Sequence, residues 1–94
     1  MERTFYLFAY DIAEPKRLNR IAKILESIGE RVQDSVFEAY LTEEEVQRLL
    51  KKVRKIMKEE EDSLRIYVLC RACRSKIYCV GRGSPTPPPS TMIV

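Results

Sequence analysis

The segment Thr4–Ile12, with the sequence TFYLFAYDI, restricts the possible folds of this chain more than any other. It is rich in aromatic and branched side chains and contains no glycine or proline, which is typical of a β-strand. Alternation places Phe5 and Leu7 on one face and Tyr6 and Phe8 on the other, so both faces are largely apolar. We therefore expect a central strand that is covered on both sides, by helices on one and by a partner subunit on the other.

Two helices are predicted after this strand. Pro15 suits the first position of a helix, and Gly29 supplies a stop. Thr42 and Glu45 form a capping box at the start of the second helix. Each helix has an apolar stripe at helical spacing, which predicts one buried face per helix. The stripes comprise Leu18, Ile21, Ala22, Leu25 and Ile28 in the first helix and Val46, Leu49, Leu50, Val53 and Met57 in the second.

The remaining segments are strand-like. Residues 30–41, ERVQDSVFEAYL, alternate well enough for a strand, but Asp34 and Ser35 interrupt the pattern, so one bent strand and a hairpin of two short strands are both compatible with it. Residues 63–70, SLRIYVLC, predict a further strand, and residues 76–80, KIYCV, are compatible with another short one.

This order of elements favours an α+β, ferredoxin-like β-α-β-β-α-β domain. Both helices would cover one face of an antiparallel sheet, and the other face would stay open for a second copy, giving a homodimer that packs sheet to sheet. The length of 94 residues suits one domain. We place that domain at residues 1–83 and a Pro-rich tail at residues 84–94, whose apolar end either frays or adds to a neighbouring subunit's sheet edge.

Charge is distributed unevenly along the chain. No acidic residue occurs in residues 63–94, and a second basic group lies early in the chain. Such segregation indicates a polyanionic partner such as nucleic acid, and a solvated surface of uneven charge is the simpler alternative. No apolar run approaches the roughly 20 residues that a membrane span needs, so we expect a cytoplasmic location. The basic residues are Arg65, Arg71, Arg74, Lys76 and Arg82 in the C-terminal region and Lys16, Arg17, Arg20, Lys23 and Arg31 in the early group.

The cysteines give a weaker signal. Cys70 and Cys73 form a C-x-x-C motif, and Cys79 follows. With no histidine, these thiols cannot complete a Cys₄ or Cys₂His₂ zinc site within one chain. A redox C-x-x-C usually begins a helix, whereas no strong helix pattern follows this one. Structural thiols or an incidental disulfide are therefore favoured over metal binding or redox catalysis.

Three stretches together resemble a known family. YDI closes the first predicted strand, KRLNRIAKILESIGERVQDSVFE covers the first helix and the next strand, and DSLRIYVLC forms a later strand. In this order and spacing they resemble the small CRISPR-associated adaptation protein, the ferredoxin-like family of CRISPR-associated endoribonucleases that partners the adaptation integrase. The resemblance covers roughly residues 4–81, and the Pro-rich tail lies outside it.

The resemblance implies an activity and a site. Family members are homodimers in which the aspartate that closes the first strand, here Asp11, faces its twin across the two-fold axis and binds Mg²⁺ or Mn²⁺ there. They are assigned metal-dependent cleavage of RNA or of double-stranded DNA, and a role in spacer acquisition in which they bridge integrase subunits and hold DNA. Asp11 is thus the expected catalytic and metal-binding residue.

Other residues fall at motif positions of the family or in the early basic group. Arg17, Arg20 and Arg31 are candidates for binding nucleic acid by positioning phosphates, and surface ion pairing is the alternative for them. Tyr10 and Phe37 match motif positions as well. We interpret them as core residues in preference to residues that support the site.

Physical chemistry agrees with a role for Asp11 but leaves two function classes open. One carboxylate is a poor Mg²⁺ site, whereas two symmetry-related carboxylates with water and phosphate oxygens would suffice. Without histidine, no imidazole base is available. Asp11 could instead cap the helix near Pro15 or close a turn. The chain is therefore either a metal-dependent phosphodiesterase or a non-catalytic DNA-binding adaptor that bridges integrase subunits.

Overall fold

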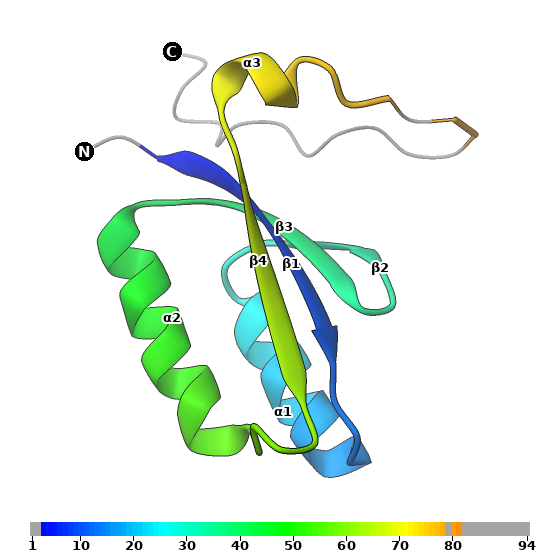
Figure 1. The fold of residues 1–94 in the computed structure, drawn as a ribbon, viewed down its shortest axis with the longest axis vertical. Coiled ribbons are helices and arrows are strands. Elements are labelled where there is room, and N and C mark those ends of the chain that lie inside the picture. The colour runs from blue at the N-terminus through cyan, green and yellow to red at the C-terminus, as the bar shows by residue number, and fades with distance from the viewer. Residues whose placement is uncertain (1–2, 79, 82–94) are drawn as a thin grey trace.

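A computed structural model describes residues 3–78, 80 and 81, and the predicted tail at residues 84–94 lies outside these. The elements follow in the predicted order, with one short helix added near the end (Figure 1). They are β1 (Thr4–Asp11), α1 (Pro15–Glu26), β2 (Glu30–Gln33), β3 (Val36–Leu41), α2 (Glu43–Ile56), β4 (Ser63–Leu69) and α3 (Arg71–Arg74).

The strands form one sheet in the order β2-β3-β1-β4, and each neighbouring pair is antiparallel. β1 lies in the centre, where Phe8 pairs with Phe37 of β3 and with Ile66 of β4. α1 and α2 pack on the same face of this sheet. The predicted ferredoxin-like β-α-β-β-α-β fold, with its antiparallel sheet and two main helices, is confirmed.

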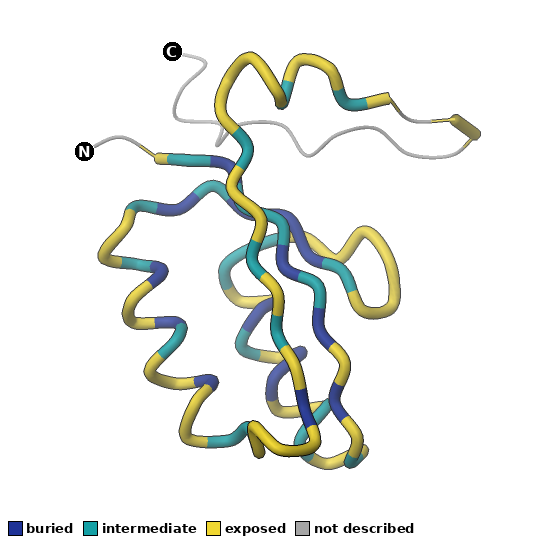
Figure 2. Tube along the Cα trace, viewed as in Figure 1, coloured by how far each residue is buried: buried dark blue, intermediate teal, exposed yellow. Residues whose placement is uncertain are grey.

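The hydrophobic core lies between the sheet and the two helices. Figure 2 shows the buried positions along β1 and β3 and on the inward sides of α1 and α2. Each helix contributes the stripe that its sequence predicts, so amphipathic spacing is sufficient to orient both helices. The core cluster comprises Phe8, Tyr10, Ile12, Ile21, Leu25, Phe37, Ala39, Leu41, Val46, Leu49 and Val53.

Local signals explain where the helices begin and how α1 meets β3. The Thr42 side chain accepts a hydrogen bond from the Glu45 N–H, and the Glu45 carboxylate accepts one from the Thr42 N–H, which completes the predicted capping box. Beyond α1, a Cβ atom on Gly29 would lie 2.4 Å from the carbonyl oxygen of Glu38. Only glycine therefore allows the chain to pass so close to β3.

The second half of the sheet resolves the alternatives that the sequence left open. Residues 30–41 form two strands, β2 and β3, joined by a turn at Asp34 and Ser35, with an irregular register between Arg31 and Gln33. β4 ends at Leu69, one residue before the predicted end. Residues 76–78 form no strand, and Cys79 lies outside the described residues.

The helix α3 was not expected. Cys70 is its N-cap, and the Cys70 sulfur accepts a hydrogen bond from the Cys73 N–H. The C-x-x-C motif therefore begins a short helix, although no strong helix pattern follows it in the sequence. A helix this short has too few residues for a recognisable apolar period, which explains why the sequence pattern did not show it.

The second face of the sheet is not covered by α1 or α2. Alternation assigns Leu7, Ala9 and Asp11 of β1 to this face, together with Arg65 and Tyr67 of β4. Tyr67 is 46% exposed, which is high for a large aromatic side chain in a sheet. We call this surface the open face. No helix in the described part of the chain is long and apolar enough to cross a membrane.

Candidate functional site

Asp11 is the last residue of β1 and lies on the open face opposite Ser63 of β4. Its side chain is exposed, and it has no hydrogen-bond or ion-pair partner among the residues that the structure describes. The helix-capping role is excluded, because the carboxylate of Glu14 caps α1 by accepting a hydrogen bond from the Arg17 N–H at 2.9 Å. Asp11 is therefore available to bind a ligand in front of the sheet.

The donor set around Asp11 fits a divalent cation only when a second chain contributes to it. A carboxylate oxygen is the ligand that Mg²⁺ prefers, but Mg²⁺ requires about six oxygens. Residues 3–78, 80 and 81 contain no cluster of three or more His, Cys, Asp or Glu side chains that could hold a metal. Two Asp11 carboxylates on facing copies, together with water and phosphate oxygens, would meet the requirement.

Arg17 does not lie on the open face but in a buried ion pair. Its Nε donates to Asp62 Oδ2 at 2.9 Å, and its Nη2 donates to Asp62 Oδ1 at 3.2 Å. Nη2 also donates to Glu61 at 2.9 Å, and the Arg17 side chain is 13% exposed. Because the Arg17 guanidinium is paired with these carboxylates, its geometry favours a structural role. Binding of Arg17 to nucleic acid stays a prediction.

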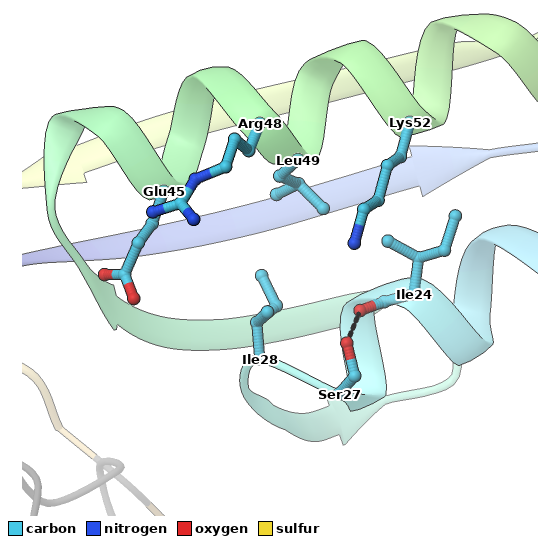
Figure 3. Close-up of a pocket in the computed structure, with 7 residues that line it drawn as sticks. All are labelled: Ile24, Ser27, Ile28, Glu45, Arg48, Leu49 and Lys52. Carbon is cyan, nitrogen blue, oxygen red and sulfur yellow. Dashed lines mark hydrogen bonds between the residues drawn. The ribbon is translucent and has the colours of Figure 1, made fainter.

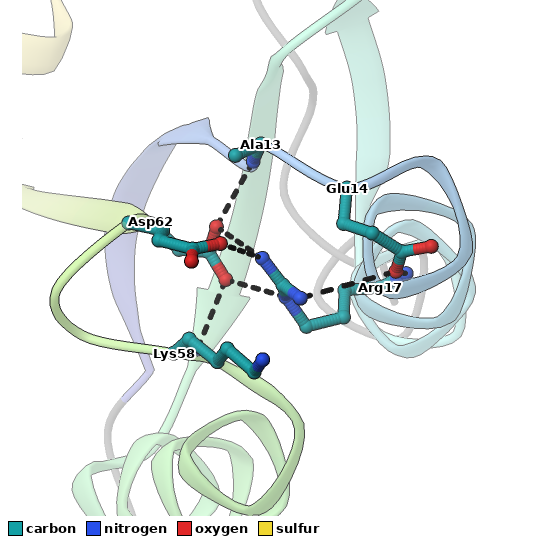
Figure 4. A network of polar contacts seen from close by, with 6 residues as sticks. Ala13, Glu14, Arg17, Lys58 and Asp62 are labelled. Atoms are coloured by element: carbon teal, nitrogen blue, oxygen red, sulfur yellow. Dashed lines mark hydrogen bonds and ion pairs between the residues drawn. The ribbon is translucent and has the colours of Figure 1, made fainter.

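The Asp62 carboxylate is the centre of this network (Figure 4). It is fully buried, and it also accepts hydrogen bonds from the backbone N–H groups of Ala13 and Lys58, each at 2.9 Å. The Arg17 guanidinium and these two N–H groups hold the pKa of Asp62 well below its ordinary value. Asp62 thereby joins the β1–α1 loop to the α2–β4 loop. Nothing in the sequence except the acidic run EEED before β4 indicated this contact.

Arg31 and Arg20 also belong to the helix side of the molecule and not to the open face. Arg31 pairs with Phe37 across β2 and β3, which places it on the helix side of the sheet. Its guanidinium lies over the Phe37 ring, 5.3 Å from the centroid, and 3.2 Å from a carboxylate oxygen of Glu26. Arg20 is exposed on α1. None of the three predicted arginines thus shares the open face with Asp11.

Tyr10 and Phe37 are core residues, which confirms the interpretation that the sequence favoured for them. Their rings lie 5.8 Å apart, and both are buried on the helix side of the sheet. The Tyr10 hydroxyl donates to the carbonyl oxygen of Asp34 at 2.9 Å, and burial raises the pKa of Tyr10. Because neighbouring residues of a strand face opposite ways, Tyr10 points away from the face that carries Asp11.

Arg65 and Tyr67 share the open face with Asp11 and were not selected from the sequence. Arg65 pairs with Ala9, so it is a diagonal neighbour of Asp11 across β1 and β4, a distance that long side chains can span. Tyr67 pairs with Leu7. The signal was present in the alternation of SLRIYVLC, in which Arg65 and Tyr67 occupy the face opposite the apolar residues.

The helix layer has a separate groove between α1 and α2 (Figure 3). It encloses about 170 Å³, and Arg48 and Lys52 stand beside Ile24, Ile28 and Leu49. This groove lies on the side of the sheet opposite Asp11. Chemistry at Asp11 would therefore take place on the open face and not in this groove.

Fold and site together define a small α+β protein of the ferredoxin-like class, with an exposed acidic residue, Asp11, on the sheet face that α1 and α2 leave open. The family model described as CRISPR associated protein Cas2 matches residues 4–77. The chain belongs to this family.

Individual relatives agree with this assignment. The CRISPR-associated endoribonuclease Cas2 1 of Chloroflexus aurantiacus is 47% identical over 88 residues, which cover 93% of this chain and 91% of the relative. The crystal structure of Streptococcus pyogenes Cas2 has a TM-score of 0.73 at 32% identity, covering 82% of this chain and 99% of that one. A chain of a partial Cas6-RT-Cas1–Cas2 complex has a TM-score of 0.73 at 29% identity, covering 87% of this chain and 88% of that one.

Proposed function

We propose that this chain acts as a homodimer in CRISPR spacer acquisition and hydrolyses phosphodiester bonds in RNA or duplex DNA with the help of Mg²⁺ or Mn²⁺ at paired Asp11 residues. The observation that carries the proposal is the position of Asp11, which is exposed on the open face and has no hydrogen-bond or ion-pair partner among the described residues. The name of the Chloroflexus relative, an endoribonuclease, supports the activity.

The open face supports the homodimer. Leu7 and Tyr67 form an apolar pair on it, and neither α1 nor α2 covers this side of β1. A second copy seated on this face would remove apolar surface from water at a gain of about 25 cal/mol per Å². A two-fold axis through the face would also bring Asp11 of each copy toward the same point.

The chain's own residues would bind and orient the substrate. Asp11 would supply carboxylate oxygens, and a divalent cation bound there supplies Lewis-acid polarisation of a phosphoryl oxygen and a more acidic water. Arg65, beside Asp11 on the open face, would hold a phosphate of the substrate. Arg20 and Arg31, exposed on the helix side, would contact the nucleic-acid backbone away from the cleaved bond.

A non-catalytic adaptor is the second candidate. The similarity to a chain of a Cas1–Cas2 complex favours it, because a rigid dimer that holds DNA between integrase subunits needs no catalytic group. The donor set also favours it, since the described residues contain no cluster of three or more His, Cys, Asp or Glu side chains that could hold a metal. An adaptation integrase is the proposed partner in both cases.

A nuclease assay separates the two candidates. Wild type, Asp11→Asn and Glu44→Gln are compared on RNA and on duplex DNA, with Mg²⁺ or with EDTA. Glu44 is an exposed acid on α2, so Glu44→Gln removes the same charge far from the open face. Cleavage by wild type and Glu44→Gln, absent in Asp11→Asn and in EDTA, supports the enzyme. Binding without cleavage in all three proteins supports the adaptor.

A further inference from the structure

The proposed function leaves the thiols of Cys70 and Cys73 unused. Both side chains are exposed, and they are three residues apart in one helical turn after β4. The Cys73 N–H lies 3.5 Å from the Cys70 sulfur and donates a hydrogen bond to it, and the Arg74 N–H donates to the Cys70 carbonyl oxygen at 2.8 Å. The hydrogen bond places the Cys70 sulfur against the backbone of Cys73.

The turn is held in place by contacts with the sheet. Arg74 Nη1 donates to the Tyr40 hydroxyl at 2.6 Å, and the Arg74 guanidinium lies over the Tyr40 ring, 5.4 Å from its centroid. The Tyr40 ring in turn meets the ring of Phe5 edge-on at 5.0 Å. The thiols are therefore presented to solvent from an ordered support.

The hydrogen bonds give the two thiols different chemistry. The hydrogen bond from the Cys73 N–H to the Cys70 sulfur lowers the pKa of the Cys70 thiol. The neighbouring Cys70 side chain raises the pKa of the Cys73 thiol. Because the thiolate is the nucleophile in thiol exchange, Cys70 is suited to attack first and Cys73 to resolve the product.

We infer that Cys70 and Cys73 form a redox site that is oxidised reversibly to an intramolecular disulfide by low-molecular-weight disulfides. The Cys70 thiolate attacks one sulfur of the small disulfide, whose S–S bond breaks and releases one thiolate, which takes up a proton. Cys73 then loses its proton and attacks the Cys70 sulfur, and the second small thiol leaves. The chain loses two electrons and two protons, and the small disulfide is reduced to two thiols.

The experiment uses the full chain, fully reduced and then equilibrated with mixtures of reduced and oxidised glutathione. Remaining thiols are blocked with iodoacetamide, and the products are mapped by mass spectrometry of peptides. Wild type and Cys79→Ser should both acquire a Cys70–Cys73 disulfide, and excess reduced glutathione should reverse it.

Single substitutions test the order of the steps. Cys73→Ser should accumulate glutathione on Cys70, because no resolving thiol remains. Cys70→Ser should react with oxidised glutathione at least about tenfold more slowly, because the thiol favoured as thiolate is gone. Both residues are exposed, so the variants should fold, and far-ultraviolet circular dichroism checks this.

Three results would overturn the inference. The first is a wild-type chain that stays reduced across the glutathione series. The second is a disulfide that always includes Cys79 or that links two chains. The third is protection of both thiols from iodoacetamide by stoichiometric Zn²⁺ together with no disulfide in its absence, which would make the pair part of a metal site.

Discussion

Arg17 and Asp62 are 45 positions apart in the sequence, yet they form a bidentate ion pair that joins the start of α1 to the loop before β4. The carboxylate is fully buried, and each of its oxygens also accepts a backbone N–H. Arg17, which its charge suggested as a phosphate ligand, is in this structure a part of the fold.

Loss of this pair should destabilise the chain. Asp62→Ala leaves a mostly buried guanidinium and two N–H groups without their acceptor, so we expect the melting temperature to fall by about 10 °C or more. Glu61→Ala is the matched control, because Glu61 contacts the same guanidinium from an exposed position and should change the melting temperature by less than about 3 °C. Equal small effects of both substitutions would contradict the structural role.

The same pair predicts a pH dependence. The folded chain holds the pKa of Asp62 below its ordinary value of 3.8, so the unfolded chain binds the proton more readily. The contribution of Asp62 to stability is therefore complete above the unfolded pKa and is lost as pH falls below it toward the folded pKa. Urea unfolding of wild type and Asp62→Asn should show a stability difference that is constant from pH 7 to about pH 5 and shrinks below about pH 4. A stability difference that grows as the pH falls would show that folding does not lower the pKa of Asp62.

Asp11 should destabilise the metal-free dimer and stabilise the metal-bound one. Two carboxylates brought together on a two-fold axis repel each other, and a cation removes the repulsion. Asp11→Asn should raise the melting temperature in EDTA by on the order of 5 °C and should abolish stabilisation by Mg²⁺. Thermal unfolding with and without metal measures both effects, with Glu44→Gln as the control. Retained stabilisation by Mg²⁺ in Asp11→Asn would place the metal elsewhere.

Two groups of arginines should affect nucleic acid differently. Arg65→Ala should reduce cleavage of bound substrate, because Arg65 neighbours Asp11. Arg20→Ala and Arg31→Ala should weaken binding and flatten its salt dependence by a slope of about 0.9 per lost phosphate contact, with cleavage of bound substrate unchanged. Binding measured over a series of salt concentrations, with single-turnover cleavage, gives both quantities. Unchanged slopes for Arg20 and Arg31 would identify them as solvated surface.

Gly29 should not tolerate a side chain. A methyl group there meets the Glu38 carbonyl oxygen and the Ala39 side chain, so Gly29→Ala should destabilise the fold by about 1–3 kcal/mol. Gln47→Ala, at an exposed position of α2, should change the stability by less than about 0.5 kcal/mol. Urea unfolding compares the two. A Gly29→Ala chain as stable as wild type would show that β3 can move aside.

The sequence was sufficient for those parts of the fold that depend on local periodicity. Sequence periodicity predicted the apolar stripes of α1 and α2 and the alternation in β1 and β4, because burial of one face places apolar residues at regular intervals. The site was only partly predictable. Asp11 was found through a family motif, but the separation of Arg20 and Arg31 from it depends on which face of the sheet each element occupies. The ion pair of Arg17 with Asp62 has no local signature, since charged residues in a loop look alike whether they are buried or solvated.

The central position of β1 also limits when the chain can fold during synthesis. β1 is made first, but its register with β4 involves residues as late as Leu69. Until β4 has left the ribosome, one edge of β1 has no strand to pair with, and the aromatic side chains of TFYLFAYDI remain open to other chains. Such non-local pairing slows folding and prolongs exposure to aggregation. We therefore expect nascent chains that end before β4 to depend on chaperones, although the finished domain is small.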